Sequence, residues 1–70
     1  MNKEAMIKVE GQGRFSFTYP TTCHREALED PGDYQGWAFS HKLITQHYNI
    51  DGKIMYEVTN YYKRKANGQI

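Results

Sequence analysis

Two glycine-containing turns, each flanked by alternating apolar and polar residues, constrain the fold of this chain most. The first is Gly11-Gln12-Gly13, a three-residue turn in which glycine readily takes positive φ angles. The residues around it predict an antiparallel hairpin over residues 5–19 with one apolar and one mostly polar face. Its expected pairs are Glu10 with Arg14, Val9 with Phe15, Lys8 with Ser16, Ile7 with Phe17, Met6 with Thr18 and Ala5 with Tyr19.

The second turn, Asp51-Gly52, predicts another hairpin over residues 43–62, because Asp-Gly is favoured in two-residue type I′ turns. In that register Ile50 faces Lys53 and Tyr48 faces Met55. The face with Leu43 and Val58 is the more apolar at its centre, so we expect it to point to the core. The other face would carry Lys42, Ile44, Gln46, Tyr48 and Ile50 against Lys53, Met55, Glu57, Thr59 and Tyr61.

A short helix is predicted between the two hairpins. Thr22 is suited to N-cap a helix that runs through Asp30, and Pro31-Gly32 would end it. The residues expected to face inward are Cys23, Ala27 and Leu28.

Residues 34–48 allow two interpretations, a strand or a second helix. The strand is favoured because the segment and its end contain glycine, threonine and asparagine, which are poor helix residues. The Asp-Gly turn that follows also requires a strand before it. A helix would instead place Trp37, His41, Ile44 and Tyr48 on one stripe.

These elements predict an α+β fold, in which two antiparallel β-hairpins form a small sheet with one short helix. A small SH3-like all-β barrel is the alternative. The length of 70 residues allows one domain, assigned to residues 1–65, with residues 66–70 as a disordered tail. Its core is thin, so a homodimer would gain stability by burying a second face. The expected core residues are Val9, Phe15, Phe17, Trp37, Phe39, Leu43 and Val58.

Cysteine content and hydropathy bear on the compartment. Cys23 is the single cysteine, so an internal disulfide cannot form, which favours a reducing cytoplasm. No apolar run approaches the roughly 20 residues that a membrane span requires. The first residues lack the apolar stretch of a signal peptide. We therefore expect a cytoplasmic protein without membrane association.

The motifs of common catalytic and cofactor sites do not occur. The chain lacks a Walker loop, a Rossmann glycine fingerprint, a zincin His-Glu pair and paired cysteines. Adjacent Cys23 and His24 cannot easily point the same way, and His41 and His47 lie roughly 20 Å apart on an extended strand. We expect no catalytic, cofactor or metal site, and hence no enzyme.

The leading functional hypothesis is a protein–protein interaction module, or an inhibitor or regulator of a larger target. Tyr48, Met55 and Tyr61 fall on the predicted solvent face next to Lys42 and Lys53, a composition typical of interfaces. A macromolecular partner is therefore expected, with protein favoured over nucleic acid. The predicted partner-binding residues are Lys42, Tyr48, Lys53, Met55, Tyr61, Lys63, Arg64 and Lys65.

Nucleic-acid binding is the alternative hypothesis. The run Tyr61-Tyr62-Lys63-Arg64-Lys65 interleaves aromatic rings with cations, which suits base stacking and phosphate contact. Two features weigh against it, the net charge of only +1 and an acidic middle segment. That segment contains Glu26, Glu29, Asp30 and Asp33.

Overall fold

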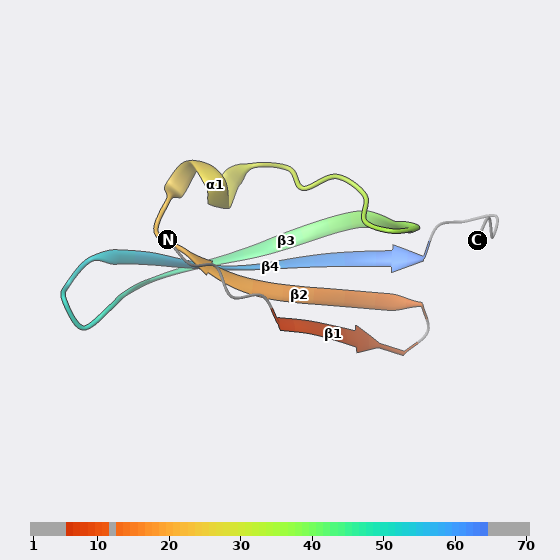
Figure 1. The fold of residues 1–70 in the computed structure, drawn as a ribbon, viewed down its shortest axis with the longest axis horizontal. Coiled ribbons are helices and arrows are strands. Elements are labelled where there is room, and N and C mark those ends of the chain that lie inside the picture. Colours follow the sequence, from red (N-terminus) through yellow and green to blue (C-terminus); the bar gives the residue numbers. More distant parts are fainter. Residues whose placement is uncertain (1–5, 12, 65–70) are drawn as a thin grey trace.

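The computed structural model describes residues 6–11 and 13–64 and contains one antiparallel sheet and one short helix. The elements are β1 (Met6–Glu10), β2 (Arg14–Thr21), α1 (His24–Leu28), β3 (Trp37–Tyr48) and β4 (Ile54–Arg64) (Figure 1). The strand order is β1-β2-β4-β3. The predicted small sheet with one helix is thus confirmed. Within the described residues the sheet stays open, with β1 and β3 at its edges, and does not close into the alternative barrel.

The first hairpin forms in the predicted register. Val9 stands opposite Phe15 and Glu10 opposite Arg14. Gly13 has φ +75°, and a Cβ there would lie 3.1 Å from the Cβ of Arg64, so glycine is required both for the turn and for the close approach of β4. Gln12, and the expected pairing of Ala5 with Tyr19, lie outside the described residues.

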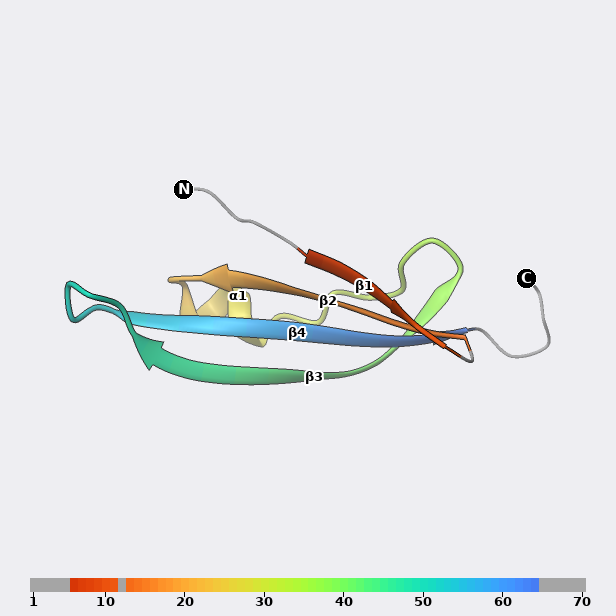
Figure 2. The same cartoon turned by 90° about the horizontal axis from the view of Figure 1, so that it is seen from below.

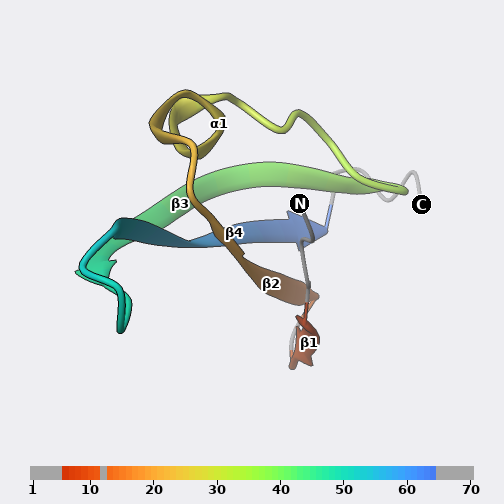
Figure 3. The ribbon, with the colours of Figure 1, turned by 60° about the vertical axis from the view of Figure 1, so that its left-hand side comes forward.

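Residues 22–36 connect β2 to β3 across one face of the sheet. Both strands are antiparallel to β4, which lies between them, so they run parallel to each other and need a crossover rather than a tight turn. The crossover carries α1, which packs against β2 and β4. Figures 1 and 3 show α1 and the loop after it along one side of the sheet, far from β1.

The helix is shorter than predicted and buries fewer side chains against the sheet. Its N-cap is Cys23 rather than Thr22, because the Thr21 hydroxyl accepts a hydrogen bond from the Cys23 amide and donates one to Glu26 Oε1. With only five helical residues, a single position reaches the sheet. Ala27 is fully buried, whereas Leu28 is 58% exposed and Cys23 is exposed, so the inward assignment of these two residues was wrong.

The second hairpin forms, but its predicted register was wrong by one residue. Tyr48 pairs with Ile54 instead of Met55. The turn has three residues rather than two, because Asn49 closes it: its carbonyl accepts from the Gly52 amide, and its side chain accepts from the Asp51 and Lys53 amides. Gly52 takes φ +82°, which matches a type I turn followed by a left-handed residue. The alternative helix over residues 34–48 was also wrong, since β3 spans most of it.

The one-residue shift exchanges the two faces of β3 relative to β4. Ile44 pairs with the fully buried Val58, which the predicted register placed opposite Thr45. Leu43 is 56% exposed and Val9 is 72% exposed, so both were wrongly assigned to the core. Val9 is exposed because β1 lies beyond the reach of α1 (Figure 3). Phe17, Trp37 and Phe39 are half-buried, and the buried apolar residues described are Phe15, Ala27, Val58 and Tyr62.

An aromatic cluster holds the covered part of the sheet together. Phe15 stacks on Tyr34 at a centroid distance of 5.3 Å and also contacts Trp37 and Tyr62. Tyr34 reaches Phe15 because residues 34–37 form a tight turn, in which Gln35 and Gly36 both have positive φ. Such ring pairs add stability beyond the area they bury.

The second hairpin extends beyond the rest of the sheet. The partner of Thr21, the last residue of β2, is Tyr56, so residues 47–55 form a two-stranded arm (Figure 2). The molecule measures 47 × 21 × 18 Å and has a radius of gyration of 13.6 Å, against about 11 Å for a compact domain of this length. No helix among the described residues is long and apolar enough to cross a bilayer.

Candidate binding face

The sheet has one covered and one bare face. The covered face lies under α1 and the loop that follows it and includes Phe15, Val58 and Tyr62. The bare face is the opposite one, since side chains alternate along each strand. Hollows of about 350 Å³ and 410 Å³ border residues of this face and share Tyr61. The bare face includes Met6, Lys8, Arg14, Ser16, Thr18, His41, Leu43, Thr59, Tyr61 and Lys63.

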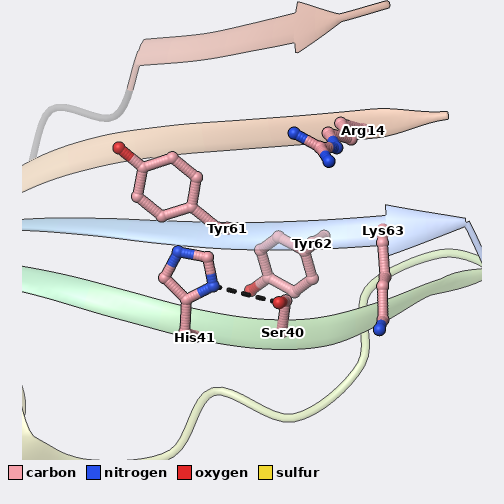
Figure 4. A pocket seen from close by; sticks show the side chains of 6 residues that line it. All are labelled: Arg14, Ser40, His41, Tyr61, Tyr62 and Lys63. Carbon is pink, nitrogen blue, oxygen red and sulfur yellow. Dashed lines mark hydrogen bonds between the residues drawn. The ribbon is translucent and has the colours of Figure 1, made fainter. Parts of the chain in front are cut away.

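A stacked pair of rings stands on β3 and β4 of the bare face. His41 and Tyr61 lie with centroids 4.6 Å apart and ring planes 10° from parallel. The β3–β4 register shifts between Phe39 and His41, which inserts Ser40 as an extra residue, as in a β-bulge. Ser40 Oγ lies 3.0 Å from His41 Nδ1 (Figure 4). The pairing of His41 with Tyr61 continues the register that runs from the arm, and the extra residue places the Ser40 hydroxyl beside the stack.

Cations border these rings. Lys8 is in the same cross-strand row as Tyr61, because both are partners of Ser16. Arg14 stands directly opposite Lys63, and both are exposed. On its other side Arg14 has Glu10 of β1 as its register partner. Like charges on directly opposed residues destabilise a sheet, and the opposite charge at the Glu10 position offsets part of that cost.

Acidic residues gather elsewhere. Glu26, Glu29, Asp30 and Asp33 belong to α1 and its following loop, which cover the opposite face. Glu57 lies further along β4, opposite Thr45 and Pro20. Four acidic residues therefore lie on the covered side, whereas Glu10 and Glu57 hold register positions on the bare face together with Lys8, Arg14 and Lys63.

Lys42 does not lie with Tyr61, as the predicted register required. It pairs with Asn60 on the covered face, and its Nζ donates hydrogen bonds to the carbonyls of Ala27, at 3.0 Å, and of Glu29. These carbonyls end α1, where a lysine both satisfies unpaired acceptors and complements the helix dipole. Lys42 thus ties the helix to the sheet.

The structure divides the other predicted partner-binding residues among three places. Met55, Tyr61 and Lys63 lie on the bare face, whereas Tyr48 lies on the opposite side of the arm and Lys53 in its turn. The guanidinium of Arg64 lies 4.6 Å from the ring centroid of Trp37. Lys65 lies outside the described residues. The run from Tyr61 to Lys65 is therefore split, because alternation sends Tyr62 into the core.

Sequence reasoning missed the site residues contributed by the first hairpin and by the bulge. Lys8, Arg14 and Ser16 were placed correctly on a polar face, but the alignment of β2 with β4 joins residues far apart in the chain. His41 was missed because the one-residue error at the turn put it on the wrong face, and Ser40 because the bulge inserts it as an extra residue. The polar face of the first hairpin was the one sequence feature that could have indicated these residues.

Titration and metal-binding features do not point to another site. Among the described residues no cluster of three or more histidines, cysteines and carboxylates could hold a metal ion. Burial raises the pKa of the Tyr62 phenol, and nearby Tyr19, Tyr34 and the carboxylates of Asp30 and Asp33 raise it further. Tyr62 belongs to the covered face, so this shift concerns stability.

Comparisons with known protein families, with curated proteins and with solved structures each found no match to this chain.

Proposed function

We propose that the protein binds single-stranded nucleic acid on the bare face of its sheet. The observation that carries this proposal is the His41–Tyr61 ring stack, with Lys8 in the same cross-strand row and the Arg14–Lys63 pair two residues further along the strands. Proteins that bind single strands combine cations along the backbone with aromatic rings for the bases. This choice reverses the order of the two hypotheses drawn from sequence.

Tyr61 supports base stacking because one side of its ring borders a slot of about 410 Å³. Thr18 and Thr59 provide hydroxyl groups at the slot and are hydrogen-bonded to each other at 2.7 Å. Ser16 also lines the slot but is only 4% exposed. Met6 and Lys8 line the other side. A planar base would stack on Tyr61 in this slot with its polar edge towards the hydroxyls, at a gain of about 1–3 kcal/mol per base.

The distribution of charge supports the same class of ligand. A single-stranded nucleic acid on the bare face would meet Lys8, Arg14 and Lys63, with Glu57 further along β4. The carboxylate of α1 and those of the loop after it lie behind the sheet. The net charge therefore does not oppose binding, since the local field decides it. The free Cys23 suits a reducing cytoplasm, where single-stranded RNA is abundant.

The test is binding of a fluorescent oligonucleotide, single-stranded DNA or RNA, across salt concentrations. Three phosphate contacts predict a slope of log affinity against log salt of about −2, at about 0.7 per contact. Arg14→Gln and Lys63→Gln should each reduce the slope by about 0.7, whereas Lys53→Gln, in the distant arm turn, should leave it unchanged. Absence of binding at low salt, or a flat slope, overturns the proposal.

A protein partner is the second candidate, and the arm favours it. Tyr48 is 63% exposed, Ile54 40% and Ile50, at the tip, 97%. Apolar side chains gathered on a protruding element are typical of docking surfaces. Affinity purification with nuclease present tests it: a protein retained by the native chain and lost with Tyr48→Ala supports docking, and equal recovery with both overturns it.

A further inference from the structure

The hollow of about 350 Å³ at the end of the bare face is surrounded by donors. Four of its lining side chains are a guanidinium, an ammonium, an imidazole and a hydroxyl, from Arg14, Lys63, His41 and Ser40. Of the side chains that the structure describes, no carboxylate lines it. Two of these groups are permanent cations and the other two can donate hydrogen bonds, a combination that suits an anion.

Three strands bring these donors together. Arg14 comes from β2, Lys63 from β4, and Ser40 and His41 from β3 (Figure 4). Tyr62 also lines the hollow, but its side chain is 3% exposed and belongs to the covered face. The β4 backbone at Tyr62 therefore lies beneath the hollow, and Tyr61 and His41 form one of its sides.

Two costly features of the sheet coincide at this hollow. Arg14 and Lys63 are cations at directly opposed backbone positions, an unfavourable pairing that the neighbouring Glu10 position offsets only on the β1 side. Figure 4 shows the Lys63 ammonium directed towards β3, so the two cations flank the hollow from different sides. The irregularity at Ser40 interrupts the β3–β4 ladder, and bulges commonly re-aim side chains beside functional sites. An anion in the hollow would offset the repulsion. It would also accept a hydrogen bond from the Ser40 hydroxyl when His41 Nδ1 is protonated and donates to Ser40 Oγ.

We propose that this hollow is a phosphate-binding subsite. Arginine provides a planar fork that matches phosphate oxygens, and lysine adds a point charge. The identity of the phosphate as part of a nucleic acid rests on the proposed function. The hollow shares Tyr61 with the slot, so a phosphate held here places the adjoining nucleoside on the Tyr61 ring. The phosphate is either a terminal phosphate or one within the backbone.

The experiment titrates the full chain with inorganic phosphate and follows backbone and side-chain resonances. We expect saturable shifts centred on Arg14, Ser40 and Lys63, and about tenfold weaker binding for Arg14→Gln and for Lys63→Gln. Lys53→Gln is the matched control and should bind as the native chain does. Arg14 and Lys63 are exposed, so unchanged melting temperatures should accompany these losses. The subsite is overturned if the resonance shifts are equally large at Lys8 and Lys53. It is also overturned if neither Arg14→Gln nor Lys63→Gln weakens phosphate binding.

Oligonucleotides with and without a 5′-phosphate form the second arm. Tighter binding of the phosphorylated strand, lost in Arg14→Gln, assigns the hollow to a terminal phosphate, and equal binding that is weakened by Arg14→Gln assigns it to the backbone. If Arg14→Gln binds the oligonucleotide as tightly as the native chain does, the phosphate subsite is overturned but the proposed function is not. If the hollow binds inorganic phosphate but the protein binds no oligonucleotide, the subsite is retained. The phosphate it binds then does not belong to a nucleic acid.

Discussion

The covered and bare faces of the sheet both carry aromatic residues, but these residues have different surroundings on the two faces. Tyr61 and Tyr62 are neighbours in β4, yet Tyr62 is buried against Phe15 and Tyr61 stacks on His41 at the surface. Strand alternation alone separates them. On the covered face rings surround rings, and on the bare face they stand among cations and hydroxyls. Aromatic content therefore becomes informative only when the face of each ring is known.

The largest expected effect belongs to Phe15→Ala on the covered face. Phe15 is 5% exposed and contacts four other rings, so truncation should reduce the free energy of unfolding by about 3–5 kcal/mol. That is the whole stability expected of a domain this small, and chemical denaturation should find the variant largely unfolded. Leu43→Ala on the bare face is the control and should lose under about 1 kcal/mol. Similar losses for both would abolish the distinction between the faces.

The bare face should show the reverse pattern with Tyr61→Ala. Loss of its ring should weaken single-strand binding by about 1–3 kcal/mol, or roughly 5- to 150-fold, as measured by fluorescence anisotropy. Thermal melting should change little, because only cross-strand contacts are removed. Tyr61→Phe retains the stacking surface and should bind nearly as the native chain does. A collapse of stability in Tyr61→Ala would show that this ring supports the fold.

Lys42→Met probes the link between helix and sheet. The change removes the hydrogen bonds to the Ala27 and Glu29 carbonyls and should cost about 1–2 kcal/mol in the free energy of unfolding. Strand binding should be unaffected, since Lys42 lies on the covered face. Lys53→Met is the control and should be neutral. Reduced nucleic-acid affinity at unchanged stability would instead return Lys42 to the binding surface.

The smallest expected effect is an alkaline loss of stability at Tyr62. Its pKa is raised by burial above the ordinary value of 10.0, so above about pH 10 the unfolded chain releases this proton before the folded chain does. Stability from this source is complete below that pH and declines as pH rises through the folded pKa. Denaturation measured from pH 8 to 11 should show a shallower decline for Tyr62→Phe. Identical slopes would mean that Tyr62 does not contribute.

The two hairpins show how far sequence could predict this fold. The first hairpin has glycines at both ends of its turn and a consistent polarity pattern. A single register agreed with both the turn and the polarity pattern, and it is the one observed. In the second, Asp51-Gly52 indicated a two-residue turn, but the Asn49 side chain bonds two turn amides and adds a residue. The faces of the second hairpin are both mixed in polarity, so the pattern could not correct the error.

The candidate site was less predictable because it depends on contacts distant in sequence. Arg14 approaches Lys63 only through the pairing of β2 with β4, for which no turn gives a signal. The irregularity at Ser40 left no recognisable mark in composition. Tyr61 and Lys63 were identified from their interleaving with cations, and the neighbours that complete the site came from the tertiary arrangement.

Photo-cross-linking tests most directly whether the bare face binds the strand. A single-stranded oligonucleotide carrying a photoreactive pyrimidine would be irradiated with the native chain, and the attached residue identified by mass spectrometry. We predict attachment at Tyr61 or His41, with loss of the product at high salt as phosphate contacts weaken. Attachment at Trp37 on the opposite side of the sheet, or at Tyr48 in the arm, would contradict the assignment of nucleic-acid binding to the bare face.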